Sequence, residues 1–110
     1  MTSDEVSNLV REQIGNRWDT TNLHGVDLRR CLVRPQRVSM MTYCPSPNGI
    51  ATYEKIEVWI VLEEGPDTKN GYKIVLEEVT GKFGLAMRCD DDQLLYLGSY
   101  GDFMATLEAM

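Results

Sequence analysis

The chain has 110 residues, of which 43% are hydrophobic and 25% charged, and its formal net charge is −6 at pH 7. This size and composition predict one globular domain over residues 1–110 and argue against an intrinsically disordered chain. We expect a cytoplasmic protein that binds neither nucleic acid, which needs a basic surface, nor a membrane, because no apolar run approaches the roughly 20 residues that cross a bilayer and no secretory signal is recognisable.

The first segment has the amphipathic pattern of a helix. Thr2 and Glu5 have the three-residue spacing of a capping box, which predicts a helix start at this point. The residues that then recur at helical spacing form one apolar side: Val6, Leu9, Val10, Ile14 and Trp18. We predict a helix over residues 3–17, although Gly15 is a plausible earlier stop.

Residues 19–26 form a polar connector, and the segment 27–43 after it is rich in valine, leucine, methionine and arginine. Pro35 stands in the middle of this segment and cannot donate a hydrogen bond to a sheet. The segment is therefore either one edge strand bent at Pro35 or two short strands. The strongest turn signal of the chain follows at 44–49, where two prolines precede an Asn-Gly dipeptide.

Apolar and charged residues alternate between positions 51 and 97 in four segments separated by turn sequences. We predict strands over residues 52–63, 72–79, 82–88 and 94–97. Gly98 and Gly101 then end the sheet, and Asp102 is placed to cap a short C-terminal helix.

These elements predict an α+β fold: an N-terminal helix, an antiparallel meander of about five strands and a short C-terminal helix. Short turns make consecutive strands neighbours in the sheet. We expect both helices to pack on one face of a curved sheet.

The other face of this sheet should be polar, yet two strands carry large apolar residues there. In the strands at 52–63 and 72–79, the apolar side chains that fall opposite the main apolar row are Tyr53, Trp59, Val61, Val75 and Val79. An exposed apolar patch of this kind marks an interaction surface. The alternative is that another part of the chain covers it.

Charge is unevenly distributed along the sequence. Residues 1–44 have a net charge of +1 and contain a basic stretch (Arg29, Arg30, Arg34 and Arg37), whereas residues 45–110 have a net charge of −7. The strand glutamates either pair with these arginines or form an acidic surface for a basic partner. The predicted partner-binding residues are Tyr53, Trp59, Val61, Val75, Glu57 and Glu77.

The sequence offers few candidates for catalysis, and we assign no catalytic residue. His24 is the only histidine, and Asp27 follows three residues later, a combination that can serve acid–base chemistry but more often stabilises a loop. An alternative function is a small-molecule binder or enzyme, with a pocket between the sheet and the helices near His24, Tyr43 and Tyr100.

No metal or cofactor site is predicted. The aspartates at 90–92 lack the alternating ligands, the central glycine and the closing glutamate of a calcium loop. The glycines at 98 and 101 fit a sharp turn better than a phosphate cradle, because Asp102 would repel an anion. The cysteines at 31, 44 and 89 are odd in number and far apart, as is typical of reduced thiols.

In size, acidity and the order helix, sheet, helix, the chain resembles small bacterial interaction proteins such as the immunity proteins of toxin systems. Its layout also resembles that of type III secretion chaperones, although the turn at Thr80-Gly81 leaves no space for the helix that they carry between their third and fourth strands. The resemblance covers layout and no sequence motif. It implies a small, non-enzymatic module that binds another protein or a second copy of itself.

Overall fold

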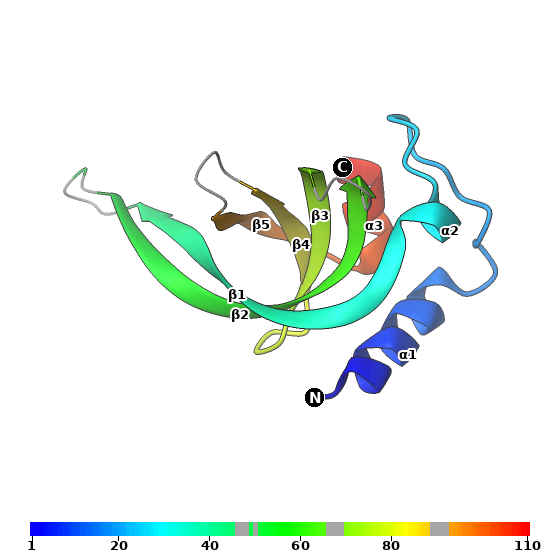
Figure 1. The fold of residues 1–110 in the computed structure, drawn as a ribbon, viewed down its shortest axis with the longest axis horizontal. Helices are drawn as coiled ribbons and strands as arrows, with labels where there is room; N and C mark the ends of the chain where they lie inside the picture. Colours follow the sequence, from blue (N-terminus) through cyan, green and yellow to red (C-terminus); the bar gives the residue numbers. More distant parts are fainter. Residues whose placement is uncertain (46–48, 50, 66–69, 89–92) are drawn as a thin grey trace.

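Helices flank a five-stranded meander along the chain (Figure 1). The computed structural model describes residues 1–45, 49, 51–65, 70–88 and 93–110. Its elements are α1 (Ser3–Ile14), α2 (Leu28–Cys31), β1 (Leu32–Pro45), β2 (Ala51–Gly65), β3 (Asn70–Glu77), β4 (Phe83–Arg88), β5 (Leu94–Gly101) and α3 (Phe103–Ala109). The predicted α+β class and element order are confirmed.

Helix α1 begins where its cap was predicted but ends earlier. The Thr2 hydroxyl accepts a hydrogen bond from the backbone N–H of Glu5 at 3.2 Å. Gly15 adopts a φ of +61°, and its N–H closes the last turn of the helix, so that α1 ends at Ile14 and not three residues later. Trp18 therefore lies beyond the helix, where it packs half-buried against the core.

The segment 27–43 differs from the prediction at its start. Its first turn is the short helix α2, whose N-cap Asp27 accepts a backbone hydrogen bond at 3.2 Å. Strand β1 then runs through Pro35 without interruption, which confirms the single-strand alternative. The proline is tolerated because it lies in a bulge between Leu32 and Gln36, where the register with β2 shifts.

The sheet closes into a barrel, which the sequence analysis did not predict. Consecutive strands pair antiparallel from β1 to β5. The first and fifth strands of such a meander run in the same direction, so the closing pair of β1 and β5 is parallel. It joins Met41 to Leu95 and Thr42 to Tyr96, and the strand order is β1-β2-β3-β4-β5.

Closure gives the sheet a separate core on each face. The outer core lies beneath the helices and includes Val6, Val10, Ile14, Trp59, Val61, Leu62, Ile74, Leu76, Phe83, Leu85, Phe103 and Leu107. The core inside the barrel consists of Met40, Val58, Ile60, Val75, Ala86 and Tyr96. The strands are therefore apolar on both faces, as expected for a sheet buried on both sides.

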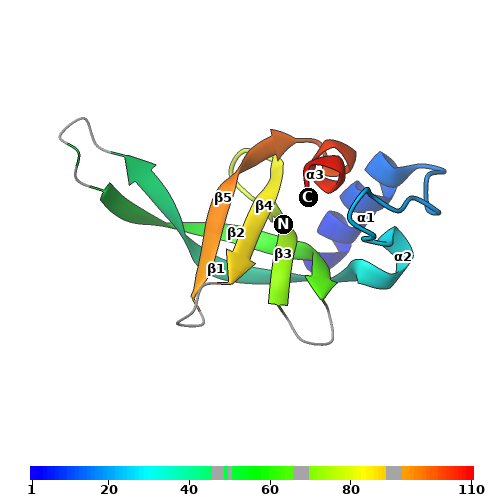
Figure 2. The same cartoon turned by 90° about the horizontal axis from the view of Figure 1, so that it is seen from above.

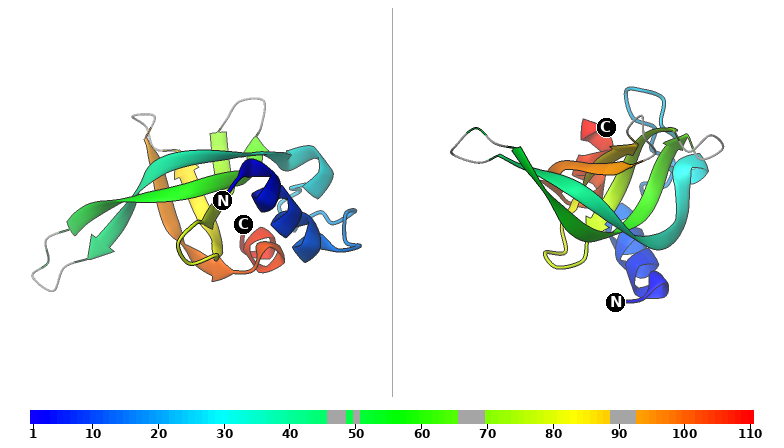
Figure 3. Two further views of the ribbon diagram at one scale, coloured as in Figure 1. Left: turned by 90° about the horizontal axis from the view of Figure 1, so that it is seen from below. Right: turned by 60° about the vertical axis from the view of Figure 1, so that its left-hand side comes forward.

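The helices gather at one end of the molecule, and a ribbon of β1 and β2 projects from the other end (Figures 1 and 2). Helices α1 and α3 contact each other and pack on the outer face of the barrel (Figure 3), as predicted. Residues 51–57 of β2 pair with β1 alone, because pairing with β3 begins at Val58. This projecting ribbon contributes to dimensions of 47 × 27 × 21 Å.

The polar connector before α2 holds helix α3 in place. The Asn22 side chain donates from Nδ2 to the carbonyl oxygen of Leu107 at 3.0 Å. Its Oδ1 accepts hydrogen bonds from the backbone N–H groups of His24 and Val26, at 3.0 and 2.9 Å. One side chain thus shapes the connector and binds it to α3.

Two side chains accept hydrogen bonds from backbone N–H groups in the first turn of α3. Asp102 accepts a hydrogen bond from the N–H of Ala105 at 2.7 Å, which confirms its predicted role as a cap. Gln13 of α1 accepts a hydrogen bond from the N–H of Phe103 at 2.6 Å. Because Gly101 precedes the cap with a φ of +98°, the predicted sharp turn between sheet and helix is confirmed at this glycine. Gly98 was also expected to end the sheet, but it lies inside β5, where it pairs with Leu85.

Candidate functional site

The predicted apolar interaction surface is buried at its centre. Trp59 is 7% exposed, and Val61 and Val75 are fully buried. Trp59 and Val61 pack in the outer core, where Trp59 Nε1 donates to Glu78 at 3.4 Å, while Val75 faces the inside of the barrel. The prediction that these three side chains are exposed is therefore wrong, because the closed sheet has a core on each face.

Tyr53 and Val79 do remain exposed, at 57% and 90%. Tyr53 lies on the projecting ribbon, and Val79 lies in the turn after β3. They belong to separate elements, so the five apolar residues of the prediction do not form one continuous patch.

The two glutamates assigned to the surface have neighbours within the chain. Glu57 accepts a hydrogen bond from the Ser39 hydroxyl, and its carboxylate lies 4.0 Å from Nε of Arg37. Burial raises the pKa of the Tyr96 phenol, and the negative charge of Glu77 raises it further, which places that carboxylate near the barrel interior. Arg37 therefore pairs with a strand glutamate of the same chain, as in the first of the two alternatives for these charges.

His24 and Asp27 serve the local structure. Nδ1 of His24 lies 2.6 Å from the carbonyl oxygen of Met110, and Asp27 caps α2. Tyr100 is exposed on β5, and the Tyr43 side chain lies outside the described part of the structure. Neither cavity described below is lined by His24, Asp27 or Tyr100.

Cys31 is a buried free thiol whose Sγ donates to the carbonyl oxygen of Glu64 at 3.7 Å. Burial raises its pKa, so the thiol stays protonated and is a poor nucleophile. The Cys44 side chain and the residues 89–92 lie outside the described residues, including the predicted aspartate loop. Among the residues that are described, no three His, Cys, Asp or Glu side chains are grouped to hold a metal ion.

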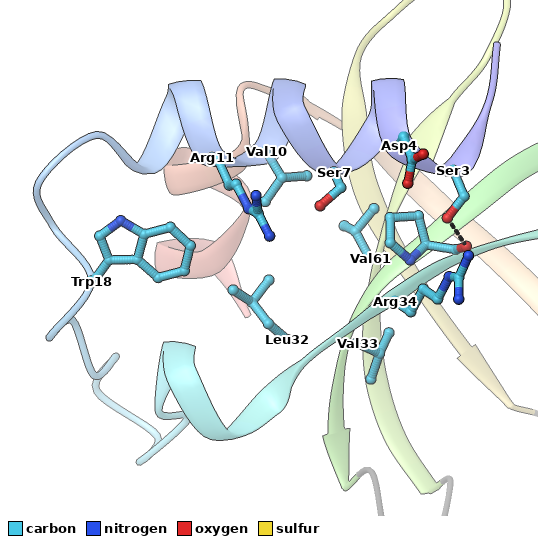
Figure 4. Close-up of a pocket in the computed structure, with 11 residues that line it drawn as sticks. Ser3, Asp4, Ser7, Val10, Arg11, Trp18, Leu32, Val33, Arg34 and Val61 are labelled. Atoms are coloured by element: carbon cyan, nitrogen blue, oxygen red, sulfur yellow. Dashed lines mark hydrogen bonds between the residues drawn. The ribbon is translucent and has the colours of Figure 1, made fainter.

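A groove of about 390 Å³ lies between α1 and the beginning of β1, and we call it the helix–strand groove (Figure 4). It is lined by Ser3, Asp4, Ser7, Val10, Arg11, Trp18, Leu32, Val33, Arg34, Pro35 and Val61. The side chains of Val10, Leu32 and Val61 point into the space between the helix and the strand, with Trp18 at one end. The floor of the groove is therefore apolar.

Two local features position the elements on either side of the groove. The Ser3 hydroxyl donates to the carbonyl oxygen of Pro35 at 2.9 Å, which fastens the start of α1 to the bulge of β1 (dashed line in Figure 4). At the other end, the Arg29 guanidinium lies 5.9 Å from the centre of the Trp18 ring, within the range of a cation–π contact. The groove extends between these two contacts.

Arginine supplies two of the three charged groups among the described residues that line the groove. These are Arg11 of α1 and Arg34 of β1, and Asp4 is the one carboxylate. In a protein with a net charge of −6, this face is locally positive.

A second cavity, of about 240 Å³, lies at one end of the barrel interior, and we call it the barrel-mouth cavity. It is lined by Val33, Arg34, Gln36, Val38, Ile60, Glu63, Lys73, Arg88 and Leu94. Lys73 is fully buried, and its Nζ lies 3.1 Å from Oε1 of Glu63. Because Val33 and Arg34 line both cavities, the first part of β1 separates them.

No protein-family model, curated protein or solved structure matches the chain. Among the helices that the structure describes, none has both the length and the apolar character needed to cross a bilayer.

Sequence reasoning did not find either cavity. Helical spacing correctly placed Val10 and Trp18 on the buried side of the first segment, and Arg34 was recognised as part of a basic stretch. No local signal in the sequence, however, indicates that α1 lies beside β1. Lys73 stands in an alternating strand, where a lysine normally faces water. Only the closure of the barrel buries it.

Proposed function

We propose that this protein is a non-enzymatic module that binds a partner protein through the helix–strand groove. The observation that carries the proposal is the combination of an apolar floor with two arginines at its edge. Val10, Leu32 and Val61 line the floor, and Arg11 and Arg34 line the same space from opposite elements. This differs from the surface expected from the sequence, whose central residues are buried.

The charges favour an acidic partner segment. Arg11 and Arg34 outnumber the single carboxylate of Asp4 in the groove, whereas Arg29, beyond its end against Trp18, is paired with Asp19 at 3.2 Å. Arginine and tryptophan are the side chains that dominate binding energy in protein interfaces. The occupant that fits is therefore a short segment with a large apolar side chain for the floor and carboxylates for the arginines.

The candidate residues for catalysis have structural roles in this chain, which supports binding over chemistry. His24 contacts the Met110 carbonyl, Asp27 caps a helix and Cys31 is a buried thiol with a raised pKa. The free thiol also favours a reducing compartment, and we place the protein in the cytoplasm within this proposal.

Selection from a random library of displayed peptides tests the proposal. We expect the enriched peptides to combine a large apolar residue with acidic neighbours. Ser7→Trp should fill the groove and abolish their binding, whereas Asn8→Trp, on the exposed side of α1, should leave it intact. Arg11→Gln should weaken binding about tenfold, the loss expected for a charge-assisted hydrogen bond, and the exposed Arg30→Gln should have little effect.

Two results would overturn the proposal. One is enrichment of peptides without acidic residues. The other is binding that Ser7→Trp and Arg11→Gln leave unchanged, which would place the binding site elsewhere on the surface.

A further inference from the structure

The outer face of the barrel carries large apolar side chains beyond the area that the helices cover. Strand pairing aligns one such side chain on each of four neighbouring strands, β3, β4, β5 and β1: Tyr72, Met87, Leu95 and Met41. We call these four residues the outer row. Directly paired positions on neighbouring strands point to the same face of a sheet, so the four side chains lie side by side.

Alternation along the strands places the outer row outside the barrel. Met40, Ala86 and Tyr96 belong to the core inside the barrel, and each of them adjoins a member of the row along its strand. The adjoining members therefore face the opposite way. On β3, Ile74 of the outer core stands two residues after Tyr72 and shares its face.

The helices leave the outer row uncovered. Helix α3 lies beside the beginning of β4 and the end of β5 (Figure 2), where the rings of Phe103 and Phe83 meet edge to face with their centroids 5.6 Å apart. Met87 and Leu95 stand at the other ends of these two strands. Tyr72 is 41% exposed and the other three members are half-buried, and neither core, as far as the structure describes it, includes any of the four.

The polarity of these strands is the reverse of that in an ordinary half-exposed sheet, whose charged side chains face the solvent. Lys73 of β3 and Arg88 of β4 line the barrel-mouth cavity, and Lys73 is fully buried. The outward-facing side chains that the structure describes on β3, on β4 and at the start of β5 carry no charge: Tyr72, Ile74, Leu76, Phe83, Leu85, Met87 and Leu95. An uncovered apolar face of this kind is typical of a protein interface.

We infer that the outer row is the contact face between two copies of this chain. Both copies of a two-fold dimer offer the same patch, so the patch must be complementary to itself. An uncharged apolar row meets this condition, whereas the helix–strand groove, with two arginines and one carboxylate, does not. Each copy has a net charge of −6, and two such copies approach most easily through a face without charged side chains.

The composition of the outer row fits this contact, and its size predicts a weak dimer. Tyrosine and methionine are enriched at the centres of protein interfaces. Leu97, two residues after Leu95 on β5, is 44% exposed and enlarges the apolar area. A few partly exposed side chains supply only the centre of an interface, since a standard one buries roughly 800 Å² per partner. We therefore expect a dissociation constant in the micromolar range.

Sedimentation velocity of the full chain over a wide range of concentration tests the inference. We expect the mass to rise from that of a monomer to that of a dimer. Tyr72→Lys should weaken the dimer at least about tenfold, because it buries a charged group without a partner in an apolar contact. Val79→Lys is the matched control, since it places the same charge at a 90% exposed apolar position in the turn after β3. Met87→Lys is a second variant in the row.

This inference does not depend on the helix–strand groove, and the two surfaces are tested separately. Tyr72→Lys should retain the binding of peptides selected for the groove, and Ser7→Trp should leave the dimer unchanged. A monomeric mass at every concentration overturns the inference and would assign the row to a different partner. A dimer that is as stable in the folded Tyr72→Lys and Met87→Lys proteins as in the wild type overturns it as well.

Discussion

Lys73 and Glu63 face each other across β3 and β2, with Nζ and Oε1 3.1 Å apart and the lysine side chain sealed from solvent. The pair depends on the bulge in β2, because the shift in register brings Glu63 opposite Lys73. An ammonium group at this depth needs a carboxylate close by to offset its lost hydration. The pair therefore links strand register directly to stability.

Removing the carboxylate should be costly. We expect Glu63→Leu to lower the free energy of unfolding by about 3 kcal/mol, because a buried positive charge loses its neutralising neighbour. Urea denaturation monitored by circular dichroism measures the change. The double variant with Lys73→Met should recover most of the loss, and the exposed Glu54→Leu is the control. A loss no larger than that of the control would contradict the structural role of the pair.

Gly84 of β4 has no room for a side chain. A Cβ atom there would lie within 3.0 Å of both the Gly98 carbonyl oxygen and the Tyr96 hydroxyl. We expect Gly84→Ala to destabilise the protein by about 3 kcal/mol, because backbone atoms of β5 must move to relieve the overlap. Gly81→Asn is the matched control, since its turn is open and asparagine tolerates a positive φ. Thermal unfolding should separate the two variants, and equal melting temperatures would refute the expected overlap.

Tyr96 should make stability depend on alkaline pH. Burial, and then the charge of Glu77, raise the pKa of its phenol above the ordinary value of 10.0. The folded state therefore holds this proton more tightly than the unfolded state. Its contribution to stability is complete below about pH 10 and is lost as the pH rises through the folded-state pKa.

The variant Tyr96→Phe removes this contribution. Although Ser99 and Glu77 are close enough to influence the phenol, its Oη is buried without a hydrogen bond to any described residue. Stability near neutral pH should therefore change little, and its decline as the pH rises above about 10 should become shallower than in the wild type. Tyr100→Phe, at an exposed position, serves as the control. An unchanged alkaline decline in Tyr96→Phe would contradict the assignment.

Asn22 should contribute more to the stability of the fold than is usual for a residue in a polar connector. Asn22→Ala removes one hydrogen bond to Leu107 and two within the connector. We expect a loss of about 2 kcal/mol, together with faster hydrogen exchange in α3, because the connector no longer fixes that helix. Asn16→Ala, at an exposed position after α1, is the comparison. Unchanged exchange in α3 would show that this helix is held by its apolar contacts alone.

Local signals in the sequence were sufficient to predict most of the helices and strands and their order along the chain. Thr2 and Asp102 are side-chain caps whose effect depends on a few neighbouring residues, and both act as predicted. The end of α1 was misjudged because Trp18 continues the apolar spacing, whereas Gly15 stops the helix through its backbone conformation. Periodicity describes burial, and burial does not require a residue to be helical.

The closure of the barrel could not be predicted in this way, and the error at the predicted site follows from it. Trp59 and Val75 lie on opposite faces of the sheet, one beneath the helices and one inside the barrel. A pattern that is apolar on both faces fits an exposed patch and a closed barrel equally well. The pairing of Met41 with Leu95 decides between them, and it joins positions 54 residues apart.

This pairing has a consequence for motion. Among the described residues, the ladder between β1 and β5 joins two residue pairs, fewer than any of the four antiparallel ladders. We expect this ladder to open at a lower free energy than the other four, and its opening would leave the antiparallel ladders intact. The barrel then becomes an open, curved sheet for a moment, and solvent or a solute gains a route to an interior that the closed form shields.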